Sequence, residues 1–146
     1  MSAIAHDADS LDYRDAVPGL FVRAGGFVLM GTGLLVAGSG LQHLFFLSMG
    51  WVELVAAATL MTLGAVASMV GPSLVLGRSW AAILGVPVTL AMVGLMVPWG
   101  IYSTLSLFLS PLTLLAMAMT LLALLAVPAS IPGSLKATRA RNALYR

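Results

Sequence analysis

Four long apolar runs, separated by short breaks, dominate this sequence. They cover residues 20–46, 51–76, 80–102 and 111–131. A helix needs about 20 apolar residues to cross a bilayer, and backbone exposed to lipid must be hydrogen-bonded internally, so each run predicts one transmembrane helix. Only 8% of the residues are charged, whereas soluble domains carry about 25%. We therefore expect an integral membrane protein.

The breaks between the runs are short, and this constrains how the helices are arranged. Residues 48–50 and 77–79 contain turn-forming residues, and Pro111 suits the first turn of the last helix. Consecutive helices with such short connections must be antiparallel neighbours. The predicted fold is an all-α, up-down-up-down bundle of four transmembrane helices. The chain is expected to consist of a polar N-terminal tail (residues 1–18), a transmembrane domain (residues 19–133) and a basic C-terminal tail (residues 134–146).

The distribution of Lys and Arg predicts the orientation in the membrane. All seven fall on the side that holds both termini and residue 78, and none lies in the breaks near residues 48 and 106. Cytoplasmic segments carry the excess of Lys and Arg, so both termini are expected in the cytoplasm, as in a multi-pass protein of the bacterial inner membrane. The aromatic residues expected at the outer interface are Trp51, Trp99 and Tyr102. The cations expected to contact lipid at the inner interface are Arg23, Arg78, Lys136, Arg139 and Arg141.

The first run carries a glycine repeat that predicts close helix packing. Gly26, Gly33 and Gly40 recur every seven residues, and Gly31 and Gly38 do the same. Small residues at this spacing form a groove that lets another helix approach closely. We expect the groove to pack against a helix of this chain or of a second copy. A flat ligand, such as a quinone or a carotenoid, is the alternative.

Two titratable residues interrupt the otherwise apolar stretch HLFFLSMGWVE. His43 lies five residues before the centre of the first break and Glu53 five residues after it. An antiparallel hairpin would place both at similar depth near the outer interface, where they are predicted to form a polar pair, either directly or through Gln42 or a water. An acid within a membrane span is a candidate functional group. The structural alternative is that Glu53, in the first turn of its helix, only complements the helix dipole.

Several classes of function are disfavoured by what the sequence lacks. There is no cysteine, which excludes disulfides, iron–sulfur ligation and thiol catalysis. No HExxH, CxxC or phosphate-binding loop occurs, and no second histidine lies within the runs to form a bis-histidine haem site with His43. No catalytic residue, metal site or obligatory cofactor is predicted. Only seven Lys or Arg occur, four of them at the C-terminus, and they do not indicate nucleic-acid binding.

Two stretches in the first half resemble the DoxX-like family of small four-helix membrane proteins. The first helix of that family is similar to the segment that contains Arg23, Gly26 and GLQHLF at residues 40–45. In this chain His43 stands where a Lys is usual. ELVAAATLMTLG, which starts at Glu53, is similar to the Glu and the Gly- and Leu-rich run of its second helix. The resemblance implies a membrane subunit associated with respiratory or redox chemistry.

The leading functional hypothesis is a small non-enzymatic subunit or scaffold. It would pack through the glycine groove against itself, as a homo-oligomer, or against a larger membrane complex, such as a redox complex. Two alternatives stay open: a small proton-coupled transporter that uses Glu53 and His43, and a quinone- or pigment-binding accessory subunit of a membrane oxidoreductase. The expected partners are the lipid bilayer and other membrane proteins.

Overall fold

The computed structural model describes residues 16–46, 50–105 and 110–144, and nearly all of them are helical. By length and composition, α2 to α5 can each cross a membrane. The prediction of an all-helical chain with four candidate membrane spans is therefore confirmed. No strand occurs within the described ranges. The helices are α2 (Leu20–Phe46), α3 (Trp51–Val75), α4 (Ser79–Leu105), α5 (Pro111–Ala129) and α6 (Ile131–Leu144).

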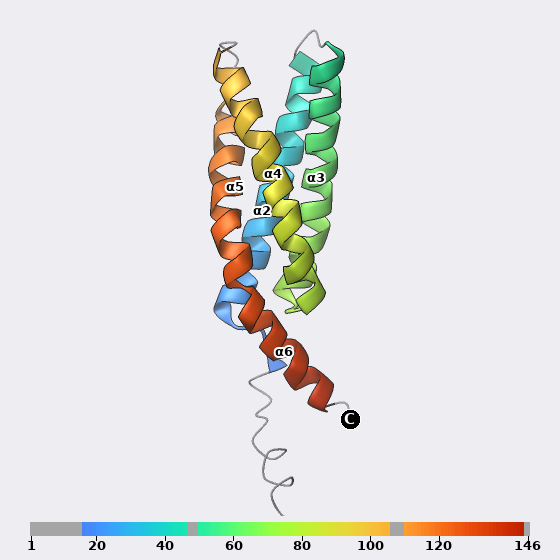
Figure 1. The fold of residues 1–146 in the computed structure, drawn as a ribbon, viewed down its shortest axis with the longest axis vertical. Helices are drawn as coiled ribbons and strands as arrows, with labels where there is room; N and C mark the ends of the chain where they lie inside the picture. The colour runs from blue at the N-terminus through green and yellow to red at the C-terminus, as the bar shows by residue number, and fades with distance from the viewer. Residues whose placement is uncertain (1–15, 47–49, 106–109, 145–146) are drawn as a thin grey trace, which may run out of the picture.

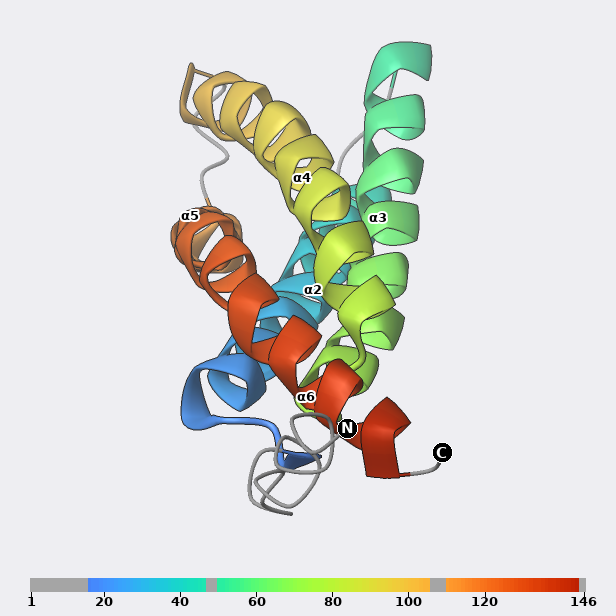
Figure 2. The ribbon, with the colours of Figure 1, turned by 60° about the horizontal axis from the view of Figure 1, so that its bottom comes forward.

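The four long helices form a bundle in which α2 and α4 both pack against α3 and α5. In Figure 1 the junctions from α2 to α3 and from α4 to α5 lie at the upper end, and the α3–α4 turn and α6 lie at the lower end. Both ribbon views show α4 leaning away from α3 toward the upper end (Figures 1 and 2). This divergence leaves the upper parts of the two helices separated.

Glycines allow α2 and α3 to approach each other closely. A Cβ atom built at Gly33 would lie 2.5 Å from the carbonyl oxygen of Gly64, and one at Gly40 would lie 2.7 Å from that of Ala57. Gly26 meets α3 in the same way, with a built Cβ 2.6 Å from the backbone nitrogen of Val75. These distances are too short for any side chain, so α3 covers this side of the glycine groove.

The second glycine pair of α2 lies on the side of α5. The atom nearest to a Cβ at Gly38 is Cδ2 of Leu112, at 3.6 Å, and the atom nearest to one at Gly31 is Cε of Met119, at 4.0 Å. Both distances are ordinary van der Waals contacts. α3 therefore fills the side of the groove formed by Gly26, Gly33 and Gly40, whereas α5 only contacts the side at Gly31 and Gly38, which stays partly exposed.

The helix ends agree with the predicted runs to within two residues, except at the end of α4 and in the C-terminal tail. α4 continues to Leu105, beyond the predicted end at residue 102, although Pro98 lies inside it. A proline removes one backbone hydrogen bond, but chain in an apolar environment remains helical because its other backbone groups need internal partners. The predicted C-terminal tail is also largely helical, since α6 begins directly after Ser130. Most of the predicted N-terminal tail, residues 1–15, lies outside the described residues, as do Arg14 and Arg146.

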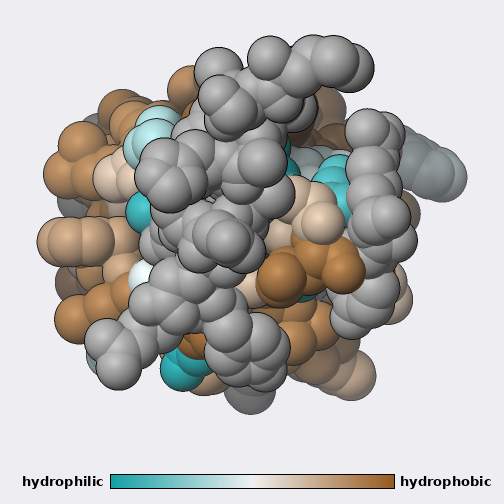
Figure 3. Space-filling model, turned by 90° about the horizontal axis from the view of Figure 1, so that it is seen from below, coloured by the Kyte–Doolittle hydropathy of each residue, from teal (hydrophilic) through white to brown (hydrophobic). Residues whose placement is uncertain are grey.

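The side surface of the bundle is apolar, as a lipid-facing surface requires. Large hydrophobic side chains point outward along all four spans, and Leu20 and Val52 are 80% and 83% exposed. Seen from the lower end, hydrophobic residues form most of the visible rim, with scattered hydrophilic residues among them (Figure 3). Exposed leucine and phenylalanine of this extent would be unfavourable in water but are favourable in a bilayer.

Candidate functional site

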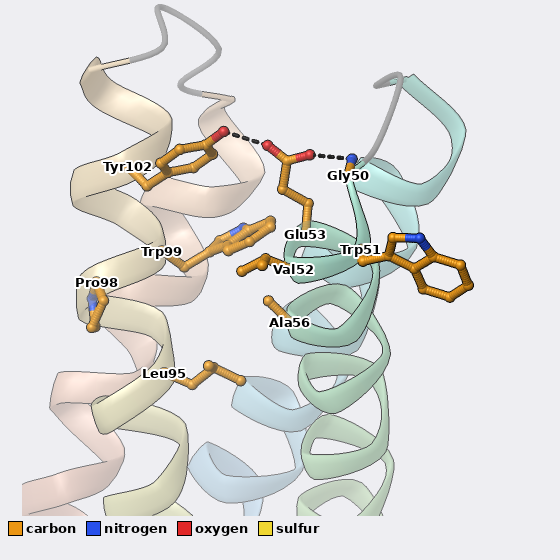
Figure 4. A pocket seen from close by; sticks show the side chains of 9 residues that line it. All are labelled: Gly50, Trp51, Val52, Glu53, Ala56, Leu95, Pro98, Trp99 and Tyr102. Carbon is orange, nitrogen blue, oxygen red and sulfur yellow. Dashed lines mark hydrogen bonds between the residues drawn. The ribbon is translucent and has the colours of Figure 1, made fainter.

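A pocket of about 490 Å³ opens between α3 and α4 where the two helices diverge. The α4 residues of the lining share one helix face, whereas α3 contributes residues from its first two turns. Almost all of this surface is apolar, and Glu53 is the one charged residue in the lining. Figure 4 shows these residues: Gly50, Trp51, Val52, Glu53, Ala56, Leu95, Pro98, Trp99 and Tyr102.

The carboxylate of Glu53 connects the two walls at the open end of the pocket. One of its oxygens accepts a hydrogen bond from the backbone N–H of Gly50 at 2.7 Å, which satisfies a free donor at the start of α3. The other accepts a hydrogen bond from the hydroxyl of Tyr102 on α4. In Figure 4 both bonds lie above the apolar part of the pocket. Glu53 therefore acts both as a helix cap and as a bridge between helices.

Trp99 forms the α4 side of the pocket and carries an unsatisfied donor. Its side chain is only 7% exposed, and its indole projects from α4 into the gap toward α3 (Figure 4). Within the described part of the chain, the indole nitrogen Nε1 is buried and has no hydrogen-bond partner. A buried donor left unpaired costs about 1–3 kcal/mol, so this N–H favours a ligand with a hydrogen-bond acceptor.

His43 supports Trp99 from the side of α2. The imidazole is buried and packs edge-on against the indole, with ring centroids 4.9 Å apart and planes at 69°. Its Nδ1 lies 2.7 Å from the backbone carbonyl oxygen of Ser39. Because a carbonyl can only accept, Nδ1 must carry a proton, and in the neutral ring Nε2 is then the acceptor. Trp99 thus lies between His43 and the pocket.

Gln42 belongs to a different polar cluster, between α2 and α5. Its side-chain oxygen accepts a hydrogen bond from the hydroxyl of Ser110 at 3.0 Å. Ser110 also caps α5, since its hydroxyl oxygen accepts the backbone N–H of Thr113 at 3.1 Å. The hydroxyl of Thr113 lies 3.1 Å from that of buried Ser39. This cluster closes the upper α2–α5 contact and takes no part in the pocket.

The structure does not join the predicted polar pair. Among the described contacts, neither His43 nor Gln42 hydrogen-bonds to Glu53. His43 and Glu53 instead meet two aromatic residues of α4, Trp99 and Tyr102, whose rings lie 6.0 Å apart. Hairpin position determines the depth of a side chain, but the direction in which it points depends on how each helix is rotated against its neighbours.

Trp99 and Tyr102 are the site residues that sequence reasoning missed, because it assigned them only to the outer membrane interface. A signal for them does exist in the sequence. Leu95, Pro98, Trp99 and Tyr102 are spaced i, i+3, i+4 and i+7, which places them on one face of α4. This pattern alone does not show which helix they face.

The predicted inner-interface cations lie on the first turns of α2, on the α3–α4 turn and on α6, away from the pocket. Four of them are exposed, namely Arg23, Arg78, Lys136 and Arg139. Arg141 is partly buried and donates a hydrogen bond to the carbonyl oxygen of Gly77 at 2.6 Å. Its role is therefore at least partly structural.

No family model matches this chain, and no curated protein or solved structure matches it either. The assignment of a function therefore depends on the geometry of the chain itself.

Proposed function

We propose that this protein is a non-enzymatic membrane protein that binds a hydrophobic molecule in the pocket between α3 and α4. The observation that carries the proposal is the buried, unpartnered Nε1–H of Trp99 in the wall of an otherwise apolar pocket. A ligand with an apolar body and a hydrogen-bond-accepting oxygen would pair with this donor after a rotation of the indole, because the nitrogen itself has no exposed surface. The pocket volume of about 490 Å³ is in the range of small-molecule sites.

The position of the pocket supports entry from the bilayer. It is open along the α3–α4 face, where neighbouring side chains such as Val52 and Leu54 are exposed. Tyr102 and Glu53 form its polar end, and Leu95 and Ala56 form its apolar end (Figure 4). A molecule with one polar end, oriented as a membrane lipid is, would match this gradient. We place this end at the outer interface, because the described cations lie at the other end of the bundle.

The test is to identify what the purified protein retains. Protein extracted from its native membrane in a mild detergent would be treated with organic solvent, and the extract analysed by mass spectrometry. One hydrophobic compound at fixed stoichiometry is expected in the wild type. Ala56→Phe fills the pocket and should abolish retention, whereas Ala58→Phe, the same change at an exposed position of α3, should not. Equal retention by both variants would overturn the proposal.

A second pair of variants examines the role of the indole N–H. Trp99→Phe removes the donor and should weaken retention about tenfold, the factor that corresponds to 1.4 kcal/mol. Trp80→Phe makes the same change at a half-exposed position outside this pocket and should leave retention unaltered. If Trp99→Phe binds as tightly as the wild type, the acceptor group of the ligand is not the basis of recognition.

The role of a subunit or scaffold in a larger membrane complex is compatible with this proposal, but part of the expected contact surface is already occupied. The side of the α2 groove formed by Gly26, Gly33 and Gly40 is filled by α3. A homo-oligomer or partner would therefore pack on the outward apolar faces or on the partly exposed side at Gly31 and Gly38. The DoxX-like resemblance would make the bound molecule a redox-active lipid, and the extraction experiment tests this directly.

A carrier is the second candidate function, and the Glu53–Tyr102 hydrogen bond favours it. Glu53 is the only acid among the described residues, and its bond to α4 spans the mouth of the pocket. A carrier would have to break this contact each time a substrate passes. In proteoliposomes, Glu53→Gln should then abolish proton-coupled uptake of the molecule identified above. Unchanged uptake would exclude Glu53 as the coupling residue.

A further inference from the structure

A second, smaller pocket of about 270 Å³ lies at the opposite end of the bundle, between the start of α4 and α6. Most of its lining residues are polar or cationic, although carbon atoms make up most of the exposed surface. It is independent of the α3–α4 pocket, and no function has been assigned to it above. The lining residues are Arg78, Ser79, Trp80, Thr138, Arg141 and Asn142.

The α3–α4 turn holds this pocket in shape. Gly77 has a φ of +70°, a left-handed conformation that favours glycine. Its carbonyl oxygen accepts hydrogen bonds from the hydroxyl of Thr138 at 3.2 Å and from Nη2 of Arg141 at 2.6 Å. The two bonds fasten α6 to the turn. Arg141 is thereby held at one wall, opposite the α4 residues that follow the turn.

The positive charge in this pocket is not neutralised by the described residues. Arg141 donates only to backbone carbonyls, those of Gly77 and Ala137, so three of its five N–H donors have no partner in the described ranges. Arg78 is exposed and makes no hydrogen bond or ion pair through its guanidinium within those ranges. Glu53, the one described acid, lies in the first turn of α3, at the end of that helix remote from the α3–α4 turn.

Two further features of this pocket are suited to binding an anion that has several oxygen atoms. α4 begins at Ser79, so its first backbone N–H groups, its dipole and the Ser79 hydroxyl are at the pocket. Guanidinium groups bind phosphate with paired hydrogen bonds and are suited to this role. Trp80, which is 48% exposed, adds an amphipathic ring of the kind that settles among lipid headgroups.

We propose that Arg78 and Arg141 form a phosphate-binding site with the start of α4 and with Asn142. The phosphate belongs to the headgroup of an anionic phospholipid or to a soluble phosphate compound. The same two guanidiniums would contact its oxygens in both cases. The apolar surface of the adjoining spans would accommodate the acyl chains only in the first case.

Native mass spectrometry of the full chain, released from an uncharged detergent, tests the site. The probes are phosphatidylglycerol, phosphatidylcholine with the same acyl chains, and inorganic phosphate as a competitor. One phosphatidylglycerol should bind in preference to phosphatidylcholine. Displacement by millimolar phosphate would identify phosphate itself as the recognised group, and failure to displace would show that the lipid chains are also needed. Both outcomes support the site, whereas equal binding of the two lipids overturns it.

Charge-matched variants decide where the lipid binds. Arg78→Gln, at an exposed position, should weaken phosphatidylglycerol binding about tenfold, because one of two charge-assisted contacts is lost. Arg23→Gln makes the same change outside the pocket and should weaken it less than about twofold. Equal losses would mean a diffuse surface effect and overturn the proposal. Asn142→Glu places a carboxylate in the pocket lining without removing either arginine, and it should abolish binding.

The aspartates of the N-terminal segment are the alternative to phosphate as the anions that pair with the two arginines. A variant with Asn at Asp7, Asp9, Asp12 and Asp15 should bind phosphatidylglycerol as the wild type does. If this variant binds phosphatidylglycerol and the wild type does not, the aspartates occupy the pocket in the wild type and the proposal is wrong.

Discussion

The carboxylate of Glu53 accepts a hydrogen bond from the hydroxyl of Tyr102, which lies 49 residues further along the chain. This bond joins the first turn of α3 to the last part of α4 at the point where the two helices have diverged. The same carboxylate caps α3 through the N–H of Gly50. One side chain therefore stabilises a helix end and closes the polar end of a pocket.

Removal of this bridge should make the pocket exchange its ligand faster. Tyr102→Phe keeps the ring and the helix cap but removes the bond to Glu53. We expect the release of the retained molecule into added detergent micelles to become about two- to threefold faster, the effect of one partly exposed hydrogen bond. Thr59→Val removes a hydroxyl from the exposed side of α3 and serves as the control. Faster release from both variants would point to general loosening of the bundle.

The contact between α2 and α3 should be sensitive to a single methyl group. At Gly33 a Cβ would meet the backbone of Gly64 and Ser68 within 2.6 Å, so Gly33→Ala must push the helices apart. We expect a loss of about 1–3 kcal/mol in the free energy of unfolding, measured by titration with a denaturing detergent. Gly94→Ala is the matched control, since no atom lies within 4 Å of its Cβ. That variant should be neutral or stabilised by about 0.5–1 kcal/mol, because alanine favours helix.

His43 should contribute to stability through its ring as well as through its hydrogen bond. His43→Phe keeps an aromatic ring against Trp99 and removes the bond to the carbonyl of Ser39. His43→Ala removes both interactions. We expect a loss of about 1 kcal/mol for the first variant and about 2–4 kcal/mol for the second, which also leaves a cavity. The Trp99 fluorescence should shift only in the alanine variant, and a shift of the same size in both would contradict the role assigned to ring packing.

The proposed orientation can be measured without background, because the chain has no cysteine. Gly50→Cys marks the end of the bundle that holds the α3–α4 pocket, and Ala143→Cys marks the end that holds α6; both positions are exposed. A maleimide that cannot cross membranes should label only Gly50→Cys in intact cells of a bacterial host. It should label both variants after permeabilisation. The reverse pattern in intact cells would place the termini outside.

The hydropathy of the sequence was sufficient to locate all four spans, because an apolar run of about 20 residues has few other stable conformations. The run that starts at Leu20 predicts α2 at both ends, and the start of α5 at Pro111 is also as predicted. Helix ends were harder to locate where polarity changes gradually. The third run was predicted to end at residue 102, but α4 continues to Leu105. α6 was missed because its amphipathic sequence is too short and too charged to register as a span.

The candidate site was predictable only in part. Glu53 was singled out as the one acid in the spans, and it does line a pocket. Its pairing with His43 was predicted from depth alone, and the structure gives the two residues different partners on α4. The glycine repeat indicated a close helix contact, but nothing in one chain distinguishes a groove that packs internally from a groove that meets a second copy.

By itself, the sequence determined that the chain suits a bilayer, the number and approximate positions of its spans, and the residues that are unusual within them. These properties depend on local composition, because the cost of placing a charge or an unpaired backbone group in lipid is incurred wherever it occurs along the chain. Only the tertiary structure decided that Trp99 separates His43 from the pocket, that Tyr102 reaches Glu53, and that α3 fills one side of the glycine groove. These relationships depend on the rotation of each helix about its axis, and packing between residues distant in the sequence determines that rotation.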